Sequence, residues 1–390
     1  MSYVLRDYQQ KASDAAVNFF ANKAKKNNAI MVLPTGAGKS LVIADIASRL
    51  EGHTLVFQPS KEILEQNYLK LCSYGILDCS IYSASFGRKE ISRITFATIG
   101  SVVNHPELFQ HFRNIIIDEC HLVNPKEGMY KSFLSMLKCK VLGLTATPYR
   151  LSSSRDFGSM LKFITRTRPC VFSEVIYQVQ ISTLLDMGYL SKLNYYPMNP
   201  LGWNELNLKV NTTGADYTDK SVVKEYERID FYGFLVSIVQ RLMNPKSGVK
   251  RKGILVFTRF LKEAERLTWS IPGAVIVSGD TPKKEREHIL EAFKAGEIPV
   301  VANVGVLTTG FDYPELDTIV MAKPTMSLAL WYQIVGRAIR PHPNKEAGWI
   351  VDLCGNFKRF GEVKDLRLVD GGNGKWAVYS NNRQLTNVRF

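Results

Sequence analysis

A short glycine-rich segment at residues 33–40, Leu-Pro-Thr-Gly-Ala-Gly-Lys-Ser, has the residue types that hold the phosphates of a nucleotide. It follows an apolar run and precedes a helical pattern, which is the context that a phosphate-binding loop requires. Backbone N–H groups of such a loop surround a phosphate, while Lys39 would reach the β- and γ-phosphates and Ser40 would bind Mg²⁺. The strict pattern has a glycine where this chain has Leu33, and Gly36 restores flexibility. The candidate nucleotide ligands here are Pro34, Thr35, Gly36, Ala37, Gly38, Lys39 and Ser40.

Two acids, Asp118 and Glu119, end a strongly apolar run at residues 115–117. Acids at the carboxyl edge of a parallel sheet lie in the crevice where ligands bind. Asp118 therefore suits Mg²⁺, bound directly or through water, and Glu119 suits the polarisation of an attacking water. With the phosphate loop, this pair predicts hydrolysis of ATP with Mg²⁺ as cofactor.

Two arginines, Arg337 and Arg340, lie three residues apart in a predicted helix far along the chain, so they share a helix face. Guanidinium groups fit phosphate oxygens, and phosphoryl transfer needs positioning and charge neutralisation more than covalent chemistry. We expect both arginines to approach the γ-phosphate from a lobe opposite Lys39. Such a site is complete only when two lobes close, as in a motor driven by hydrolysis.

The composition of the 390 residues is that of a globular protein with a net charge of +14. This charge favours a polyanionic partner, nucleic acid before a membrane. The six cysteines form no C-x-x-C pair, the first residues have no apolar signal core, and no apolar run approaches the roughly 18 residues that span a membrane. We expect a cytoplasmic protein.

Apolar runs alternate with helical patterns in the first half of the chain, which predicts a doubly wound parallel sheet. The predicted strands are 29–34, 54–59, 93–99, 114–119 and 140–146, and the predicted helices are 40–50 and 61–74.

A second alternating run begins near residue 253. Its predicted strands are 253–258, 274–278, 300–307, 318–323 and 349–353, and its predicted helices are 261–270, 283–294 and 327–340. We predict an α/β fold with two tandem lobes, each a mostly parallel sheet flanked by helices, and ATP in the cleft between them. The predicted divisions are an ATP-binding lobe at 1–193, a connector at 194–245, a second lobe at 246–368 and a tail at 369–390.

Together these segments resemble the motifs of superfamily 2 helicases over residues 3–360, which implies that both lobes are RecA-like. The segment 118–121 resembles the DExH box, and 145–148 resembles the motif that couples the ATP and nucleic-acid sites. Segment 333–340 resembles the motif whose arginines complete the ATPase site. By this resemblance Gln333 joins the catalytic residues Lys39, Asp118, Glu119, Arg337 and Arg340, and the coupling residues are His121, Thr145 and Thr147.

The same resemblance implies further contacts to nucleotide and nucleic acid. Residues 5–9 resemble the adenine-reading element, with Gln9 on the base and Arg6 in support, and Gly310 and Asp312 face the nucleotide. The implied nucleic-acid contacts are Pro59, Ser60, Lys61, Thr98, Thr258, Thr308 and Thr309. Because such contacts go to the backbone, binding should tolerate any sequence and weaken with salt.

Within the superfamily, the chain resembles the bacterial RadD-type DNA-repair helicases most closely, although it lacks their cysteine-rich C-terminal region. The resemblance implies a helicase or translocase that remodels single-stranded, forked or branched DNA in repair, recombination or replication. RNA is a less favoured partner, because RNA-type relatives place an aromatic residue well upstream of the glutamine and only eight residues precede Gln9. Two alternatives share these motifs: the motor subunit of a restriction system, and an ATP-switched clamp or annealing factor.

Overall fold

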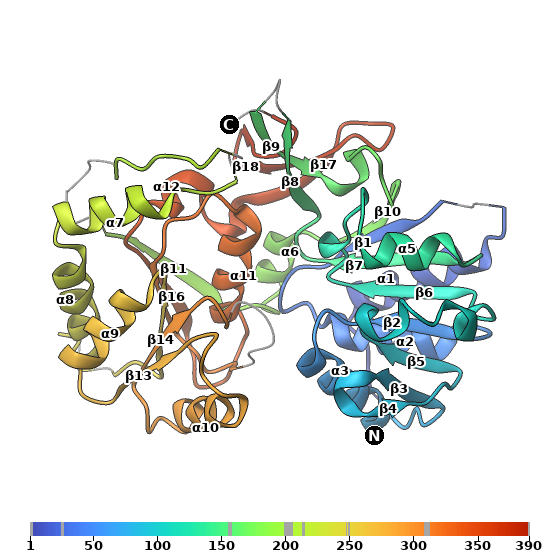
Figure 1. The fold of residues 1–390 in the computed structure, drawn as a ribbon, viewed down its shortest axis with the longest axis horizontal. Coiled ribbons are helices and arrows are strands. Elements are labelled where there is room, and N and C mark those ends of the chain that lie inside the picture. The colour runs from blue at the N-terminus through green and yellow to red at the C-terminus, as the bar shows by residue number, and fades with distance from the viewer. Residues whose placement is uncertain are drawn as a thin grey trace.

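The computed structural model describes residues 3–24, 27–154, 158–198, 206–212, 215–246, 248, 250–307 and 313–388. They form two lobes that lie side by side (Figure 1). The first lobe contains an eight-stranded sheet and the second a six-stranded sheet, and all neighbouring strands are parallel except β3 and β4. The predicted α/β fold of two mostly parallel sheets flanked by helices is confirmed.

The first sheet carries the predicted strands in its centre and adds three that the sequence did not suggest, β3, β4 and β10. In order across the sheet its strands are β10 (Glu174–Gln178), β1 (Ala29–Val32), β7 (Lys140–Thr145), β6 (Asn114–Asp118), β2 (Thr54–Phe57), β5 (Ile94–Ala97), β3 (Cys79–Ser83) and β4 (Arg88–Lys89). The helices of this lobe are α1 (Asp7–Ala21), α2 (Lys39–Arg49), α3 (Lys61–Ser73), α4 (Ile99–Val102), α5 (Met129–Ser135) and α6 (Ile181–Asp186).

The second sheet has the order β11 (Lys192–Pro197), β16 (Ala347–Asp352), β15 (Thr318–Ala322), β12 (Ile254–Thr258), β14 (Val300–Val304) and β13 (Ala274–Val277). Its helices are α7 (Asp219–Arg228), α8 (Phe231–Met243), α9 (Leu261–Ser270), α10 (Lys283–Lys294), α11 (Leu328–Ala338) and α12 (Asn356–Phe360). Both faces of the sheet are buried. Successive side chains of a strand point to opposite faces, so neighbouring residues of β12 show what covers each face. Leu255 and Phe257 join one apolar cluster, and Ile254 and Val256 join another.

The expected connector at 194–245 contributes to the second lobe wherever the structure describes it. Strand β11 pairs with β16 in the second sheet, and the apolar residues of α7 and α8 share a buried cluster with β12. The physical reason is amphipathicity: Phe231, Leu235 and Val239 lie on one face of α8, and that face is buried.

A β-hairpin and a small terminal sheet lie at the top of the molecule in Figure 1. The hairpin is formed by β8 (Tyr149–Ser154) and β9 (Gly158–Phe163), directly after the end of β7. The terminal sheet contains β17 (Leu366–Asp370), β18 (Trp376–Ser380) and β19 (Arg383–Gln384). The predicted tail is thus ordered as a sheet over its described residues.

The terminal sheet returns to the first lobe. Asn387 donates its backbone N–H to the Leu161 carbonyl at 2.6 Å, and its side-chain oxygen accepts from the Phe163 N–H at 3.1 Å. The Trp376 ring stacks on Phe163 with centroids 6.3 Å apart. The Gln180 side chain bonds both the carbonyl and the N–H of Leu368, at 2.8 and 3.0 Å.

Candidate nucleotide site between the lobes

The predicted phosphate loop joins β1 to α2 at the carboxyl edge of the first sheet. Gly36 and Gly38 have φ values of +84° and +76°, in the left-handed region that favours glycine, and Lys39 begins α2. Leu33 is fully buried in the core and donates its N–H to the Thr145 carbonyl at 3.0 Å. This packing explains why a leucine stands where the strict pattern has glycine.

The residues expected to read adenine contact the phosphate loop in this structure. Gln9 is only 4% exposed, and its amide nitrogen donates to the Ala37 carbonyl at 3.0 Å. The Gln9 side-chain oxygen accepts from the Arg6 N–H at 2.9 Å, and the Tyr8 hydroxyl also donates to the Ala37 carbonyl, at 2.9 Å. The exposed Arg6 guanidinium lies over the Tyr189 ring, 4.1 Å from its centroid. The contact of Gln9 with a base therefore stays a prediction.

The two acids lie where β6 ends, beside the loop lysine. Lys39 Nζ lies 3.1 Å from Glu119 Oε1, and Asp118 Oδ1 accepts from the Glu119 N–H at 2.9 Å. Glu119 has a φ of +50°, which is strained for a residue with a side chain. Strain of this kind persists where the surrounding structure holds it, often at functional sites, and here it places the Glu119 side chain against Lys39.

The two buried carboxyl groups differ in proton affinity because Lys39 and His121 act most strongly on Glu119. Burial, and then the charge of Glu119, raise the pKa of Asp118 above its ordinary value. Burial also acts to raise the pKa of Glu119, but Lys39 and then His121 outweigh it and lower that pKa. Glu119 is therefore ionised at neutral pH, which suits it to accept a hydrogen bond from water.

The coupling residues predicted by resemblance lie together. His121 Nδ1 lies 2.9 Å from the Thr145 hydroxyl and 3.2 Å from the Thr147 hydroxyl, and all three residues are buried. The same nitrogen lies 3.3 Å from Glu119 Oε2. The other ring nitrogen, Nε2, lies 3.5 Å from the side-chain nitrogen of Gln333 in the second lobe. His121 thus connects the acid, the end of β7 and the opposite lobe.

Helix α11 brings Arg337 to the cleft, and Arg340, predicted on the same helix, follows two residues after the helix ends at Ala338. Burial lowers the pKa of Arg337 to about 10, and the charge of Glu119 from the first lobe opposes this lowering. Arg337 therefore keeps its charge at neutral pH. Burial also lowers the pKa of Arg340.

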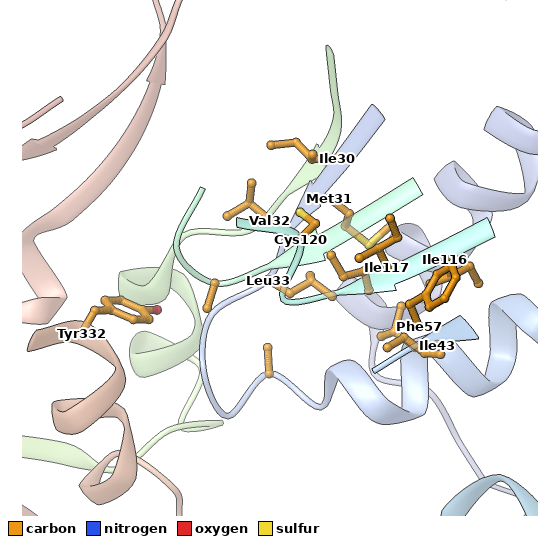
Figure 2. Packing of buried hydrophobic residues seen from close by; sticks show 14 of the residues in the cluster. Ile30, Met31, Val32, Leu33, Ile43, Phe57, Ile116, Ile117, Cys120 and Tyr332 are labelled. Carbon is orange, nitrogen blue, oxygen red and sulfur yellow. The ribbon is translucent and has the colours of Figure 1, made fainter. Parts of the chain in front are cut away.

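The close approach of α11 to the phosphate loop depends on Gly336. A Cβ atom at this position would lie 2.8 Å from Cγ2 of Thr35, so a larger residue would push the lobes apart. Figure 2 shows Tyr332 extending from the helix of the second lobe toward the first. Tyr332 is 5% exposed and belongs to the buried cluster that continues through both lobes.

The structure places the predicted nucleic-acid contacts in different surroundings. Pro59, Ser60 and Lys61 follow β2 and Thr98 follows the adjacent β5, so these four lie at one edge of the first sheet. Ser60 caps α3 by accepting from the Ile63 N–H, and Lys61 donates to the Ser85 carbonyl at 2.6 Å. The hydroxyl of Thr98 lies 2.9 Å from that of Ser101.

Thr258 differs from the other expected contacts, because it is only 1% exposed and its hydroxyl donates to the Asn303 carbonyl. In this arrangement of the chain Thr258 acts within the second lobe. The expected contacts Thr308, Thr309, Gly310 and Asp312 lie outside the described residues.

Three residues of this junction were missed by sequence reasoning. Tyr189 and Ser191 lie in the segment that leaves the first lobe, and Lys345 follows α11. None stands in a recognisable motif, so only their tertiary contacts reveal them.

Among the described residues, no helix is long and apolar enough to cross a membrane.

Two known families match separate parts of the sequence. Residues 2–150 match the family described as "Type III restriction enzyme, res subunit", and residues 235–342 match the helicase conserved C-terminal domain. These ranges contain the phosphate loop, the acid pair, and both Arg337 and Arg340.

Relatives and solved structures match over most of the chain. IRC3 of Saccharomyces cerevisiae is 25% identical over 90% of this chain and 52% of its own length. The DNA 3'-5' translocase XPB2 of Sulfurisphaera tokodaii is 27% identical, over 88% of this chain and 80% of its own. The chain therefore spans about half of the yeast relative.

A solved structure, the ATP-dependent Type ISP restriction-modification enzyme LlaBIII bound to DNA, shares the fold with a TM-score of 0.68. It is 18% identical, over 90% of this chain and 28% of its own. The two family matches lie on opposite sides of a cleft between two RecA-like lobes, and together they show that this chain is similar to superfamily 2 helicases.

Proposed function

We propose that the protein is an ATP-dependent DNA helicase or translocase that hydrolyses ATP with Mg²⁺. The observation that supports this most is the position of Glu119. Lys39 of the first lobe lies 3.1 Å from it, and the charge of Glu119 also acts on Arg337 of the second lobe. A triphosphate bound at the loop would therefore meet cations from both lobes.

The residues of the first lobe would bind and orient the substrate. Backbone N–H groups at Gly36 to Lys39 and the N-terminus of α2 would hold the β-phosphate. Lys39 would exchange its contact with Glu119 for phosphate oxygens, and Glu119 would then be available to orient the attacking water.

The donor set at Ser40 and Asp118 fits Mg²⁺, which prefers oxygen ligands and usually keeps several waters. A buried Asp118 beside the negative Glu119 has a raised pKa, and a divalent cation nearby would favour its ionised form. When bound, the ion supplies charge neutralisation between the β- and γ-phosphates.

The residues of the second lobe would stabilise the transition state. Arg337 on α11 and Arg340 just beyond it would neutralise charge on the transferring phosphoryl group. Gln333 lies beside His121, so a movement of the second lobe would be transmitted through His121 to Thr145 and Thr147. Closure and reopening of the cleft would then move the lobes along a DNA strand.

DNA as the partner is supported by the net charge of +14 and by the relative whose printed name is a DNA translocase. Polar residues after β2 and β5 would contact the DNA backbone. From the motif resemblance of the sequence we further propose single-stranded, forked or branched DNA as the substrate, and a RadD-type role in repair, recombination or replication.

Steady-state ATP hydrolysis tests the proposal. The reaction is measured without nucleic acid and with single-stranded DNA, duplex DNA, forked DNA and RNA, each at two salt concentrations. We expect strong stimulation by DNA that falls as salt rises, because backbone contacts release counterions. Stimulation by RNA alone would contradict a DNA motor.

A motor subunit of a restriction system is the second candidate, favoured by the description of the family that matches residues 2–150. Lack of stimulation by any nucleic acid alone would favour this candidate, since such a motor acts with further subunits. Strand-displacement and annealing assays separate both from an ATP-switched clamp, which would hydrolyse ATP without separating strands.

A further inference from the structure

The C-terminal end of α11 and the two residues after it are held by Ser191 and Lys345, which belong to no recognised motif. A helix leaves its last carbonyls without partners inside the helix. Here the Ile339 carbonyl accepts from the Ser191 N–H at 2.8 Å, and the Arg340 carbonyl accepts from the Ser191 hydroxyl at 3.0 Å. The Ala338 carbonyl accepts from Lys345 Nζ at 3.2 Å. The three carbonyls that follow Arg337 are therefore all occupied.

Ser191 links this helix end to the other lobe. It lies in the segment between α6 and β11, where the chain passes from the first sheet to the second, and it is only 7% exposed. Its neighbour Leu190 packs against the phosphate loop: a Cβ atom at Gly36 would lie 2.8 Å from Leu190 and 3.7 Å from Ile339. One short segment therefore contacts both the loop that would bind phosphate and the residues at the end of α11, Ile339 and Arg340.

Lys345 links the helix end to another segment of the second lobe. Its ammonium donates to the carbonyls of Pro314 and Leu316, at 2.7 and 3.2 Å, as well as to Ala338. Lys345 is 7% exposed, and burial lowers its pKa to about 8. Burial of an ammonium group is costly unless hydrogen bonds replace its contacts with water, and main-chain carbonyls supply those bonds to Lys345. Here they join residues 314–316 to the end of α11.

We propose that Ser191 and Lys345 are positioning residues that fix Arg337 and Arg340 relative to the phosphate loop. The inference rests on the proposed function, because the arginines matter only if the site turns over ATP. Neither residue touches the substrate. Ser191 sets the distance between α11 and the first lobe, and Lys345 prevents the last turn of α11 from moving independently of the lobe behind it.

Three substitutions test this role in the complete chain. Ser191→Ala removes the hydroxyl bond to Arg340, Ser191→Thr keeps a hydroxyl, and Lys345→Met removes the ammonium at similar length. We expect kcat for ATP to fall about 5-fold in Ser191→Ala and about 10-fold or more in Lys345→Met, because small displacements of catalytic groups are expensive. The KM for ATP should stay within about 2-fold, and Ser191→Thr should recover most of the rate.

Affinity for a transition-state mimic, ADP with aluminium fluoride, gives a second readout. Misplaced arginines should weaken binding of the mimic by the same factor as kcat while leaving ADP binding unchanged. A matched control is Ser327→Ala, which removes the cap at the opposite end of α11, where Ser327 accepts from the Leu330 N–H. We expect this variant to lose thermal stability and keep kcat.

Several outcomes would overturn the inference. Wild-type kcat in both Ser191→Ala and Lys345→Met would do so, as would equal losses of kcat in Ser191→Ala and Ser327→Ala, which would indicate helix stability alone. If Lys345→Met does not fold, the Ser191 variants decide. Wild-type protein that hydrolyses no ATP under any condition would overturn the proposed function and this inference with it.

Discussion

The two lobes share an architecture but bring opposite charge arrangements to the cleft. The edge of the first sheet contains charges of both signs, since Lys39 and Glu119 form an ion pair and Asp118 lies beside them. The second lobe presents cations at the end of one apolar helix, α11, where Arg337 in its last turn and Arg340 just beyond it are partly buried with lowered pKa values. The first lobe thus pairs its own lysine with its own glutamate, whereas the charge of that same Glu119 also acts across the cleft on Arg337 of the second lobe.

This difference predicts a division between substrate binding, assigned to the first lobe, and acceleration of hydrolysis, assigned to the second. Substitutions that separate KM from kcat are the direct way to test it, because uniform binding changes KM and transition-state interactions change kcat.

Lys39→Ala should have the largest effect. The substitution removes a phosphate ligand and leaves Glu119 without its nearby cation, so ATP turnover should fall by at least about 100-fold and nucleotide affinity should fall as well. Turnover and ADP binding are measured together with the melting temperature. Lys262→Ala, which removes a surface lysine paired with Glu227 on the second lobe, controls for loss of charge. Normal turnover in Lys39→Ala would rule out this site.

Arg337→Ala and Arg340→Ala should each lower kcat by about 100-fold while KM for ATP changes by no more than about 3-fold. The reason is that arginines supplied from the opposite lobe act mainly on the transition state. A large rise in KM with normal kcat would break the comparison, since the second lobe would then contribute to ground-state binding.

His121→Ala should reduce the ratio of DNA-stimulated to basal ATP hydrolysis by about 10-fold. His121 contacts Glu119, Thr145, Thr147 and Gln333, so its loss should disconnect the acid from the rest of the cleft. The measurement compares basal and stimulated rates in the same preparation. An equal fall in both rates would indicate a role in hydrolysis itself.

Glu263→Gln should have the smallest effect, on stability and not on turnover. Burial raises the pKa of this second-lobe carboxyl to about 7, although hydrogen bonds from the backbone oppose the rise. Between the ordinary value of 4.5 and about 7 the folded state binds more protons than the unfolded state, so stability falls as pH rises through this window.

The amide variant should therefore be more stable than wild type at pH 8, by on the order of 1 to 3 kcal/mol, and similar to it near pH 5. Thermal unfolding at the two pH values measures this. Glu265→Gln on the same helix is the matched control for loss of charge. Equal stability of wild type and Glu263→Gln at pH 8 would show that burial of Glu263 has no cost.

Local patterns predicted much of this fold and part of the site. The apolar runs that precede Lys39 and Asp118 became the central strands β1 and β6, because a strand buried on both faces has a distinctive sequence. Features that depend on distant contacts escaped prediction. The edge strand β11 is less apolar, with exposed Lys192 and Pro197, and its membership of the second sheet is visible only through its pairing with β16.

In the site, too, sequence patterns predicted only those residues that have a local signature. Glycines, paired acids and spaced arginines have local signatures, so their residues could be named in advance. Ser191 and Lys345 have none, because their significance lies in which carbonyls they reach. The contact of Gln9 with a base stays a prediction, since the structure shows only the bond of its side chain to the Ala37 carbonyl.

The return of the terminal sheet to the first lobe has a consequence for how this molecule can move. The chain crosses between the lobes once near Ser191 and again before Leu368, where Gln180 and Phe163 receive the terminal strands. A body attached at one point can rotate in any direction, but a body attached at two points rotates only about the line that joins them. While both attachments hold, opening of the cleft reduces to one angle, and every closure returns Arg337 and Arg340 along the same arc.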